Sequence, residues 1–465
     1  MIDLPLDVVA RIVGAREPHP SAGVVTGPVV TGPVVTDSRE VTPGALFAAI
    51  VGERSDGHDH VASAAAAGAV AVLGSRDVPG APVPVLVVPD VVDALSALAH
   101  HVVEALRPEL TVVALTGSQG KTSVKDLLRT VLATAGPVVA PVGSFNNELG
   151  VPLTILRADA STRHLVVEMG ARGIGHVAHL CRIARPDVSL VLNVGTAHVG
   201  EFGSVDAIAQ GKGEIVEALD ASGVAILNAD DHRVAAMAER TAGRVVTFGT
   251  SGDVRVGDVT LDGTGHPHFA LRFASGESRD VTVPQLGRHH ASNAAAAAAA
   301  AEALGLAPAD IVAALATSVP GSPMRMEPVP LATGALVIND AYNANPESMT
   351  AALQTLADIA GERAVAVLGP MRELGDGSEA AHRRIGELAL GLGIGRVVVV
   401  GDEALPIARA AGDIAVWVPD VESAVTQVKS SLQPDSVVLV KASRGARLER
   451  VVAALAAEDL NGEER

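Results

Sequence analysis

Cysteine and aromatic residues are scarce in this chain of 465 residues. It has one cysteine, Cys181, and aromatic residues make up 2% of the sequence. A single thiol excludes an intramolecular disulfide framework and fits a reducing compartment. No uninterrupted apolar run is long enough to span a bilayer, and the first residues carry no basic signal segment. We therefore expect a cytoplasmic protein without membrane insertion, with cores built from valine, alanine and leucine.

Positive charge is also in short supply, since the formal net charge is −18 at pH 7. This balance argues against nucleic acid or an anionic membrane as the main partner. We expect small-molecule substrates and a monomeric protein, and any anionic substrate must be held by local groups rather than by the overall field. The length predicts two to four domains.

Lysine is the rarer basic residue, with five of the 35 basic positions: Lys121, Lys125, Lys212, Lys429 and Lys441. A chain that prefers arginine is expected to keep lysine where a primary amine matters, because the two side chains differ chemically. Lys125 and Lys429 lie in helical patterns, where we expect solvated faces. Lys212 and Lys441 lie in segments flanked by glycine or serine.

The most informative motif is a glycine-rich turn at residues 116–123, with the sequence Thr-Gly-Ser-Gln-Gly-Lys-Thr-Ser. It follows an apolar, strand-like run and opens a helical pattern, as phosphate-binding loops do. Lys121 can neutralise phosphates, and the Thr122 hydroxyl can reach Mg²⁺. Two residues separate the glycines, whereas the common loop has four before Gly-Lys. The expected nucleotide-binding residues are Gly117, Ser118, Gln119, Gly120, Lys121, Thr122 and Ser123.

Polar residues follow three further apolar runs between about 106 and 320, where strands alternate with helices. Glu168, His198 and Asn228 each come at or just after the end of such a run. The carboxyl ends of parallel strands face one crevice, which the phosphate loop would share. Because several polar strand ends would converge beside the phosphate loop, we expect Glu168 and His198 to bind a metal ion, and hard oxygen ligands suit Mg²⁺.

The pattern along the chain predicts an α/β fold class with three domains. Residues 1–105 are expected to form a small mixed α/β domain and residues 106–320 a central parallel-sheet ATPase domain with a P-loop. The alternation at 252–284 predicts a small antiparallel insertion in the central domain. After a Pro-Gly-Ser-Pro linker, residues 321–465 show a second strand–helix alternation, which predicts a Rossmann-like domain.

Two polar clusters leave alternatives open. Asp37, Ser38 and Arg39 could hold a polar ligand, although a capped turn is equally consistent with their spacing. Tyr342, the only tyrosine, lies with Asn343 and Asn345 after the first strand of the C-terminal pattern. This dense set of hydrogen-bonding groups indicates a binding site, with a structural Asx turn as the competing interpretation.

Taken together, these segments resemble the Mur ligase family, ATP-dependent amide-forming enzymes of peptidoglycan synthesis. The resemblance covers essentially the whole chain. It rests on the short phosphate loop, the Asn-Asn-Glu-Leu-Gly-Val-Pro element at 146–152 and the Tyr-Asn-Ala-Asn-Pro run at 342–346. Within the family, the 342–346 run is similar to that of the enzyme adding D-alanyl-D-alanine to a UDP-N-acetylmuramoyl tripeptide. The implied cofactors are ATP and Mg²⁺, and the implied intermediate is an acyl phosphate.

The resemblance also implies a role for each matching residue. Lys121, Lys212, His198 and Arg325 would be catalytic, and Mg²⁺ would be held by Thr122, Glu168, His198 and a carbamylated Lys212. The nucleotide would contact the phosphate loop together with Asn228, His289, Asn293, Arg325 and Asp340. Substrate would be held by Asp37, Ser38 and Arg39 at the UDP end, by Asn146 and Asn147, and by Tyr342, Asn343 and Asn345 around D-alanyl-D-alanine.

Two alternatives remain at this point. One is another ATP-dependent amide ligase, such as the tripeptide-forming relative or a folylpolyglutamate synthase. The other is a nucleotide-binding scaffold that hydrolyses ATP weakly and forms no bond. The retained set of Lys121, Glu168, His198 and Lys212 argues against the scaffold, because simple binding does not need all four.

Overall fold

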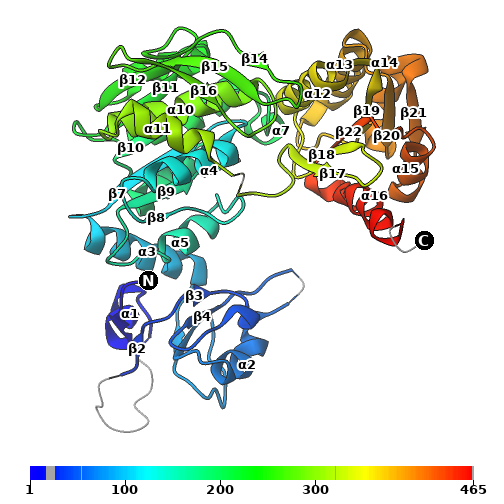
Figure 1. Cartoon of the computed structure of the whole chain (residues 1–465). Coiled ribbons are helices and arrows are strands. Elements are labelled where there is room, and N and C mark those ends of the chain that lie inside the picture. The colour runs from blue at the N-terminus through cyan, green and yellow to red at the C-terminus, as the bar shows by residue number, and fades with distance from the viewer. Residues whose placement is uncertain (17–26, 54, 320, 463–465) are drawn as a thin grey trace.

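The computed structural model describes residues 1–16, 27–53, 55–319 and 321–462, which form three domains (Figure 1). The N-terminal domain lies below the central domain in that view, and the C-terminal domain lies beside the central one. The three-domain α/β fold class is therefore confirmed. Among the described residues, no helix has the length and apolar character needed to cross a bilayer.

The N-terminal domain is a small mixed α/β unit. Its main sheet has parallel strands in the order β3-β4-β5-β6, and β1 forms a separate antiparallel pair with β2. The elements are β1 (Leu4–Pro5), α1 (Leu6–Ile12), β2 (Val29–Val30), β3 (Val34–Val35), β4 (Leu46–Ala49), α2 (Val61–Ala66), β5 (Ala71–Gly74), β6 (Val85–Val87) and α3 (Val91–Leu106).

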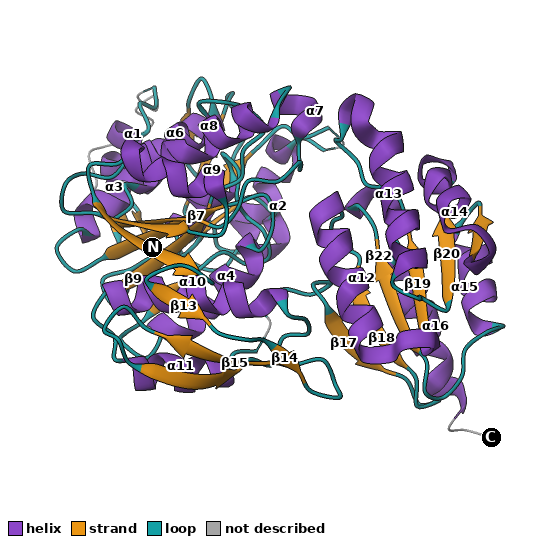
Figure 2. Cartoon of the chain, turned by 90° about the horizontal axis from the view of Figure 1, so that it is seen from above, coloured by secondary structure: helices purple, strands orange, loops and turns teal. Residues whose placement is uncertain are grey.

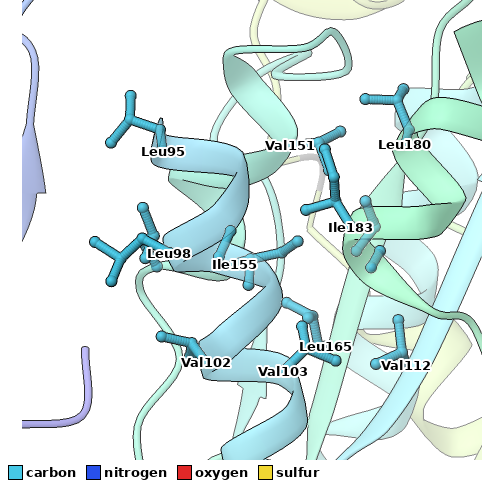
Figure 3. Packing of buried hydrophobic residues seen from close by; sticks show 14 of the residues in the cluster. Leu95, Leu98, Val102, Val103, Val112, Val151, Ile155, Leu165, Leu180 and Ile183 are labelled. Atoms are coloured by element: carbon cyan, nitrogen blue, oxygen red, sulfur yellow. The ribbon is translucent and has the colours of Figure 1, made fainter. Parts of the chain in front are cut away.

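Helix α3 joins this domain to the next, because one hydrophobic cluster spans both. Figure 3 shows Leu98 and Val102 on one side of α3 and Val103 on the other, beside Leu165 of the central domain. Asp90 caps the helix by accepting the Val92 and Asp93 N–H groups. The domain boundary expected after residue 105 falls at the end of this helix, which packs on the central domain as well as on its own.

The central domain has one large twisted sheet in the order β14-β15-β13-β12-β11-β10-β7-β9-β8, with β16 paired to β15. Strands β13 through β8 in that order are parallel. The strands are β7 (Thr111–Thr116), β8 (Val138–Val139), β9 (His164–Glu168), β10 (Val188–Val191), β11 (Val224–Asn228), β12 (Arg244–Gly249), β13 (Val254–Val256), β14 (Thr260–Leu261), β15 (Pro267–Arg272) and β16 (Ser278–Thr282). The antiparallel strands expected at 252–284 are present and extend this sheet.

Helices cover both faces of the central sheet, as the alternation of side chains along β7 requires. Val112 and Ala114 point into the cluster beneath α3, α6 and α8, whereas Val113 and Leu115 point into the cluster beneath α4, α10 and α11. The helices are α4 (Lys121–Leu132), α5 (Gly150–Ile155), α6 (His176–Ala184), α7 (Val199–Phe202), α8 (Val205–Glu217), α9 (His232–Ala235), α10 (His289–Ala303) and α11 (Pro308–Ala316).

The C-terminal domain is a doubly covered sheet in the order β17-β18-β22-β19-β20-β21, parallel except for the edge strand β17. Figure 2 shows its helices on the two sides of the sheet. The elements are β17 (Glu327–Pro330), β18 (Leu336–Asp340), α12 (Pro346–Ala360), β19 (Ala364–Leu368), α13 (Ser378–Gly391), β20 (Arg396–Val400), α14 (Leu405–Ala411), β21 (Ala415–Val418), α15 (Val421–Lys429), β22 (Val437–Lys441) and α16 (Glu449–Gly462).

Helix α10 gives a test of core packing, because its alanines at 294–301 are all fully buried between α4 and the sheet. Alanine lets the helices approach closely and leaves no room for a longer side chain. We expect Ala298→Leu to lower the free energy of unfolding by about 1–3 kcal/mol through overpacking. Urea unfolding measures this, and Ala313→Leu at an exposed position of α11 is the matched control. Equal effects of the two substitutions would contradict tight packing of α10.

Candidate active site

A cavity of about 850 Å³ lies where the central and C-terminal domains meet. It brings together nearly all the residues expected to act on ligands, from both domains. Those lining it are Ser118, Gln119, Gly120, Lys121, Thr122, Ser123, Asn146, Asn147, Glu168, His198, Lys212, Asn228, His289, Asn293, Arg325, Asp340, Tyr342, Asn343 and Asn345. Gly117, Asp37, Ser38 and Arg39 are not among its lining residues.

The phosphate loop turns into α4 through a left-handed glycine. Gly120 has φ +80°, and a Cβ added there would lie 2.7 Å from Asn293 Oδ1, so both backbone strain and close contact require glycine. The Ser118 and Gln119 N–H groups each donate to Asn193 Oδ1 at 3.0 Å. Asn193, which the sequence did not single out, therefore ties the loop to the turn after β10.

Lys121 lies at the start of α4, where its ammonium donates to the Gly117 carbonyl oxygen at 2.6 Å. Burial lowers the pKa of Lys121, with Glu168 opposing the effect and Arg325 adding to it. An approaching polyphosphate would supply the negative charge that this environment lacks.

Glu168 ends β9 with its side chain facing the cavity and 1% exposed. Its Oε1 accepts from Asn146 Nδ2 at 2.7 Å. Its Oε2 is buried and has no hydrogen-bond partner among the described residues. An unpartnered carboxylate oxygen in a cavity is suited to a cation, because burying it unpaired is costly.

His198 has a left-handed backbone, with φ +63°, and precedes α7. Its Nδ1 lies 2.5 Å from Glu373 Oε2 of the C-terminal domain. Burial lowers the pKa of His198; Glu373 opposes this, and Lys121 and Lys212 add to it. His198 thus lies where the two domains touch.

Lys212 lies on α8 and is 3% exposed. Burial lowers its pKa well below the ordinary value for lysine, and Lys121 lowers it further. The flanking glycines allow close contacts, since a Cβ at Gly211 would lie 2.9 Å from Phe202 Cε1. The amine is therefore biased toward its neutral, nucleophilic form.

A serine that the sequence did not reveal links the phosphate loop to the interdomain linker. Ser144 Oγ is 3.0 Å from Thr122 Oγ1 and accepts from Arg325 Nη2 at 2.9 Å. The Arg325 guanidinium also lies 4.2 Å from the centre of the Tyr342 ring, a cation–π contact. Arg325 is thus held from both domains.

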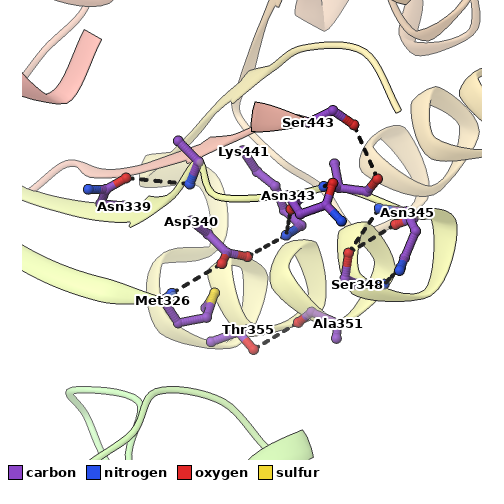
Figure 4. Close-up of polar contacts among 12 residues, drawn as sticks. Met326, Asn339, Asp340, Asn343, Asn345, Ser348, Ala351, Thr355, Lys441 and Ser443 are labelled. Carbon is purple, nitrogen blue, oxygen red and sulfur yellow. Dashed lines mark hydrogen bonds and ion pairs between the residues drawn. The ribbon is translucent and has the colours of Figure 1, made fainter. Parts of the chain in front are cut away.

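The C-terminal wall of the cavity is organised by a buried ion pair, drawn in Figure 4. Asp340 Oδ2 accepts from Lys441 Nζ at 2.6 Å, and Asp340 Oδ1 accepts from the Met326 N–H at 3.2 Å. Lys441 Nζ also donates to the Asn343 carbonyl oxygen at 2.9 Å. The pair fixes the start of the 341–346 turn against β22.

Part of the amide cluster has a structural role. Asn345 Oδ1 caps α12 by accepting the Ser348 N–H at 2.8 Å, in a reciprocal capping box. Asn147 Oδ1 accepts the Gly150 N–H at 2.9 Å at the start of α5. Both amides line the cavity, yet in each the oxygen is already engaged by backbone.

Asn228 and His289 line the cavity from the central domain. Asn228 Nδ2 donates to the Leu192 carbonyl oxygen at 2.8 Å, which links β11 to β10. Burial lowers the pKa of His289 to about 4, so its imidazole is neutral at pH 7. Lys441 adds to this shift, and Asp340 opposes it.

The expected UDP-contacting residues form a compact local turn in the N-terminal domain. Arg39 pairs with Asp37 at 2.5 Å, and Asp37 Oδ1 also accepts the Arg39 N–H at 2.9 Å. Hydrogen bonds from Arg39 lower the pKa of Asp37 to about 2. Both interpretations of this motif stay possible on geometry, since a capped turn is present and its polar groups are partly exposed.

The expectation for Lys125 was wrong. Its side chain is buried rather than solvated, and its ammonium pairs with Asp126 Oδ1 at 2.7 Å. The helical pattern gave no sign of this, because the segments that cover Lys125 come from outside α4.

Two glutamates of the C-terminal domain contact the segment from the turn after β10 to the start of α7, and the sequence pointed to neither. Glu347 Oε1 accepts from the Thr196 N–H at 2.7 Å and from Thr196 Oγ1 at 2.9 Å. The Glu373 carbonyl oxygen accepts the Gly200 N–H at 3.2 Å. The only local signal was that Glu347 follows the Asn-Ala-Asn-Pro run.

Family models match three parts of the chain: the Mur ligase family catalytic domain at 33–102, the Mur ligase middle domain at 115–301 and the Mur ligase glutamate ligase domain at 324–444. A UDP-N-acetylmuramoyl-tripeptide–D-alanyl-D-alanine ligase from Mycobacterium tuberculosis is 44% identical, with 100% of both chains covered. The enzyme of that name from Escherichia coli is 39% identical, covering 90% of this chain and 92% of the relative.

Solved structures agree with these matches. MurF from Acinetobacter baumannii superposes with a TM-score of 0.87 at 32% identity, covering 98% of this chain and 99% of the other. MurF ligase from Thermotoga maritima, in complex with ADP, gives a TM-score of 0.81 at 30% identity, covering 93% and 99%. A folylpolyglutamate synthase from Mycobacterium tuberculosis is 18% identical with a TM-score of 0.61, over 77% of this chain and 94% of the other, a likeness in fold alone.

The buried pair on the C-terminal wall gives a stability test. We expect Asp340→Asn to lower the free energy of unfolding by about 3 kcal/mol, because the Lys441 ammonium would stay buried without its anion. Denaturant unfolding measures the loss. The control is Asp7→Asn, which removes an exposed ion pair with Arg11 and should leave the unfolding midpoint nearly unchanged. A midpoint for Asp340→Asn equal to that of the control would refute the argument.

Proposed function

This chain belongs to the Mur ligase family, and we propose that its cavity joins D-alanyl-D-alanine to a UDP-N-acetylmuramoyl tripeptide, using ATP. It is an ATP-dependent, amide-forming ligase of peptidoglycan synthesis. The observation that carries the proposal is the convergence of Lys121, Glu168, His198 and Lys212 in one cavity shared by two domains.

The first step is phosphoryl transfer to the peptide. A carboxylate oxygen of the tripeptide forms a bond to the γ-phosphorus of ATP as the bond to the β–γ bridging oxygen breaks, and ADP leaves. Lys121 at the phosphate loop and Arg325 from the linker would stabilise the charge on the transferred oxygens. The product of this step is an acyl phosphate.

The second step forms the amide bond. The neutral amine of D-alanyl-D-alanine attacks the acyl carbon, phosphate leaves, and the nitrogen loses a proton. Tyr342, Asn343 and Asn345 would hold this dipeptide on the C-terminal side. Contact between the domains at Glu347 and Glu373 supports a closed space, where an acyl phosphate is protected from water.

The donor set fits Mg²⁺. Thr122, Glu168, His198 and Lys212 would hold it, and the unpartnered Glu168 Oε2 is a suitable hard ligand. Bound Mg²⁺ would supply positive charge to the phosphate oxygens. Lys212 fits this set only as a carbamate, which turns a buried amine into an anion.

The remaining residues are proposed to bind the ends of the substrates. Asn228, His289, Asn293 and Asp340 would contact ATP beyond its phosphates. Asp37, Ser38 and Arg39 would meet the UDP group, and Asn146 and Asn147 the peptide. We place the enzyme in the cytoplasm as a monomer, because ATP is a cytoplasmic cosubstrate and the cavity is completed within one chain.

The activity is tested by phosphate release that requires both substrates together. In Lys121→Ala we expect turnover to fall by at least about 100-fold, because charge stabilisation at the γ-phosphate is lost. A continuous phosphate assay measures it, with Lys429→Ala as the control that keeps wild-type turnover. Phosphate release by the wild type with ATP alone, without pentapeptide product, would favour the scaffold alternative.

The state of Lys212 has a pH signature. Its lowered pKa leaves more neutral amine at neutral pH, and the neutral amine adds to CO₂ to give a carbamate and a proton. With ¹³C-bicarbonate, we expect a carbamate carbon signal that grows as pH rises through this lowered pKa and fades below it. Lys429→Arg should keep the signal and Lys212→Arg should lose it; a signal that persists in Lys212→Arg would disprove the assignment.

A further inference from the structure

Lys125 is a buried charged group to which the proposed reaction gives no role. It lies on α4, three residues after Thr122, and is 1% exposed. Its ammonium pairs with Asp126 at 2.7 Å and donates to the carbonyl oxygens of Pro141 at 3.2 Å and Gly143 at 3.3 Å. It also donates to Ser322 Oγ at 3.0 Å. One side chain therefore contacts three separate segments.

The contacted segments beyond α4 itself are the loop between β8 and α5 and the linker between the central and C-terminal domains. The neighbouring Asp126 strengthens the second contact, because its Oδ2 accepts the Gly321 N–H at 3.2 Å. A Cβ at Gly321 would lie only 2.9 Å from Asp126 Oδ1, so the linker backbone lies directly against the pair. The Lys125–Asp126 pair thus fastens both segments to the helix of the phosphate loop.

Each of these two segments carries a side chain that lines the proposed active site. Ser144 directly follows Gly143, and Arg325 comes three residues after Ser322. Arg325 Nη2 donates to Ser144 Oγ, which in turn meets Thr122 Oγ1 on α4. These contacts therefore connect α4 to the two segments at both ends. Lys125 on α4 binds both segments, and their Arg325 and Ser144 contact each other and lead back to Thr122 on α4.

Core filling does not explain a lysine at this position. Val124, Leu127 and Leu128 on the same buried helix are apolar and fully buried. An apolar residue at 125 would avoid the desolvation of a charge, and buried ion pairs add little to stability for that reason. A charge that gathers two carbonyl oxygens, a carboxylate and a hydroxyl does, however, fix where those groups lie.

We propose that Lys125 is a positioning residue of the ligase reaction, which holds the interdomain linker and the 141–144 segment so that Arg325 and Ser144 lie at the transferred phosphate. The inference rests on the proposed function. Its effect is expected on the transition state rather than on nucleotide binding, because the polar contacts of Lys125 are with Asp126, the 141–143 segment and the linker rather than with the phosphate loop.

Two substitutions test this in the full-length enzyme. In Lys125→Met we expect kcat to fall about tenfold to hundredfold, the size of effect expected from displacing a catalytic group, with KM for ATP nearly unchanged. Ser322→Ala removes only the linker hydroxyl, and we expect kcat to fall about two- to tenfold. The control, Arg383→Met, removes an exposed positive charge from α13, outside the residues that line the cavity, and should keep wild-type kcat.

The double variant Lys125→Met/Ser322→Ala separates positioning from general destabilisation. If Lys125 acts through the linker, Ser322→Ala adds nothing once Lys125 is gone, whereas independent effects multiply. Wild-type kcat in Ser322→Ala would overturn the proposal. So would a Lys125→Met loss that matches its unfolded fraction by thermal melting, or a rise in KM alone.

If Lys125→Met does not fold, Ser322→Ala against Arg383→Met decides the question, since neither removes a buried charge. A wild-type enzyme that releases no phosphate with both substrates refutes the proposed function instead, so the two failures are distinguishable.

Discussion

The proposed active site depends on positively charged side chains that the fold gathers in one cavity. Lys121, Lys212 and Arg325 surround it, and Glu168 is the carboxylate that most directly offsets Lys121. Burial lowers the pKa of both lysines; Arg325 lowers the pKa of Lys121 further, and Lys121 lowers the pKa of Lys212 further. In a chain with net charge −18, these cations are held together by the fold rather than by the overall composition. Such a site is completed by anionic ligands, which relieve the repulsion that folding creates.

Two different structural rules assemble this cavity. On the central side, the parallel sheet brings the carboxyl ends of β7, β9, β10 and β11 to one edge, as parallel sheets generally do. On the other side, no sheet rule applies, and the C-terminal domain is placed by specific contacts. Glu347 meets Thr196 and Glu373 meets His198 in the turn after β10, and Glu373 also meets Gly200 at the start of α7. Groups proposed to bind phosphate and groups proposed to bind the amine are therefore coupled through one short segment.

Features that depend on local sequence pattern could be predicted before the structure was known. The glycine turn before α4 and the polar ends of β9 and β10 predicted the central half of the cavity, and the strand–helix alternation predicted the three domains. The sequence could not show which polar groups the backbone already uses, as with the capping oxygen of Asn345. Nor could it reveal Ser144, Asn193 or Lys125, since their partners are distant along the chain. Lys125 and Ser322, for example, are 197 residues apart.

The scarce lysines differ in how their charge is balanced, and this difference bears on chemistry. Lys125 and Lys441 are each paired with a buried carboxylate, which offsets the cost of burying the positive charge. Among the described residues, no carboxylate opposes the lowering of the pKa of Lys212, and Lys121 repels its positive charge. A buried ammonium in that position is costly, whereas a neutral amine has no charge to desolvate and an anionic adduct would be attracted by Lys121. The fold therefore pairs two lysines with carboxylates and leaves Lys212 as the lysine proposed to react.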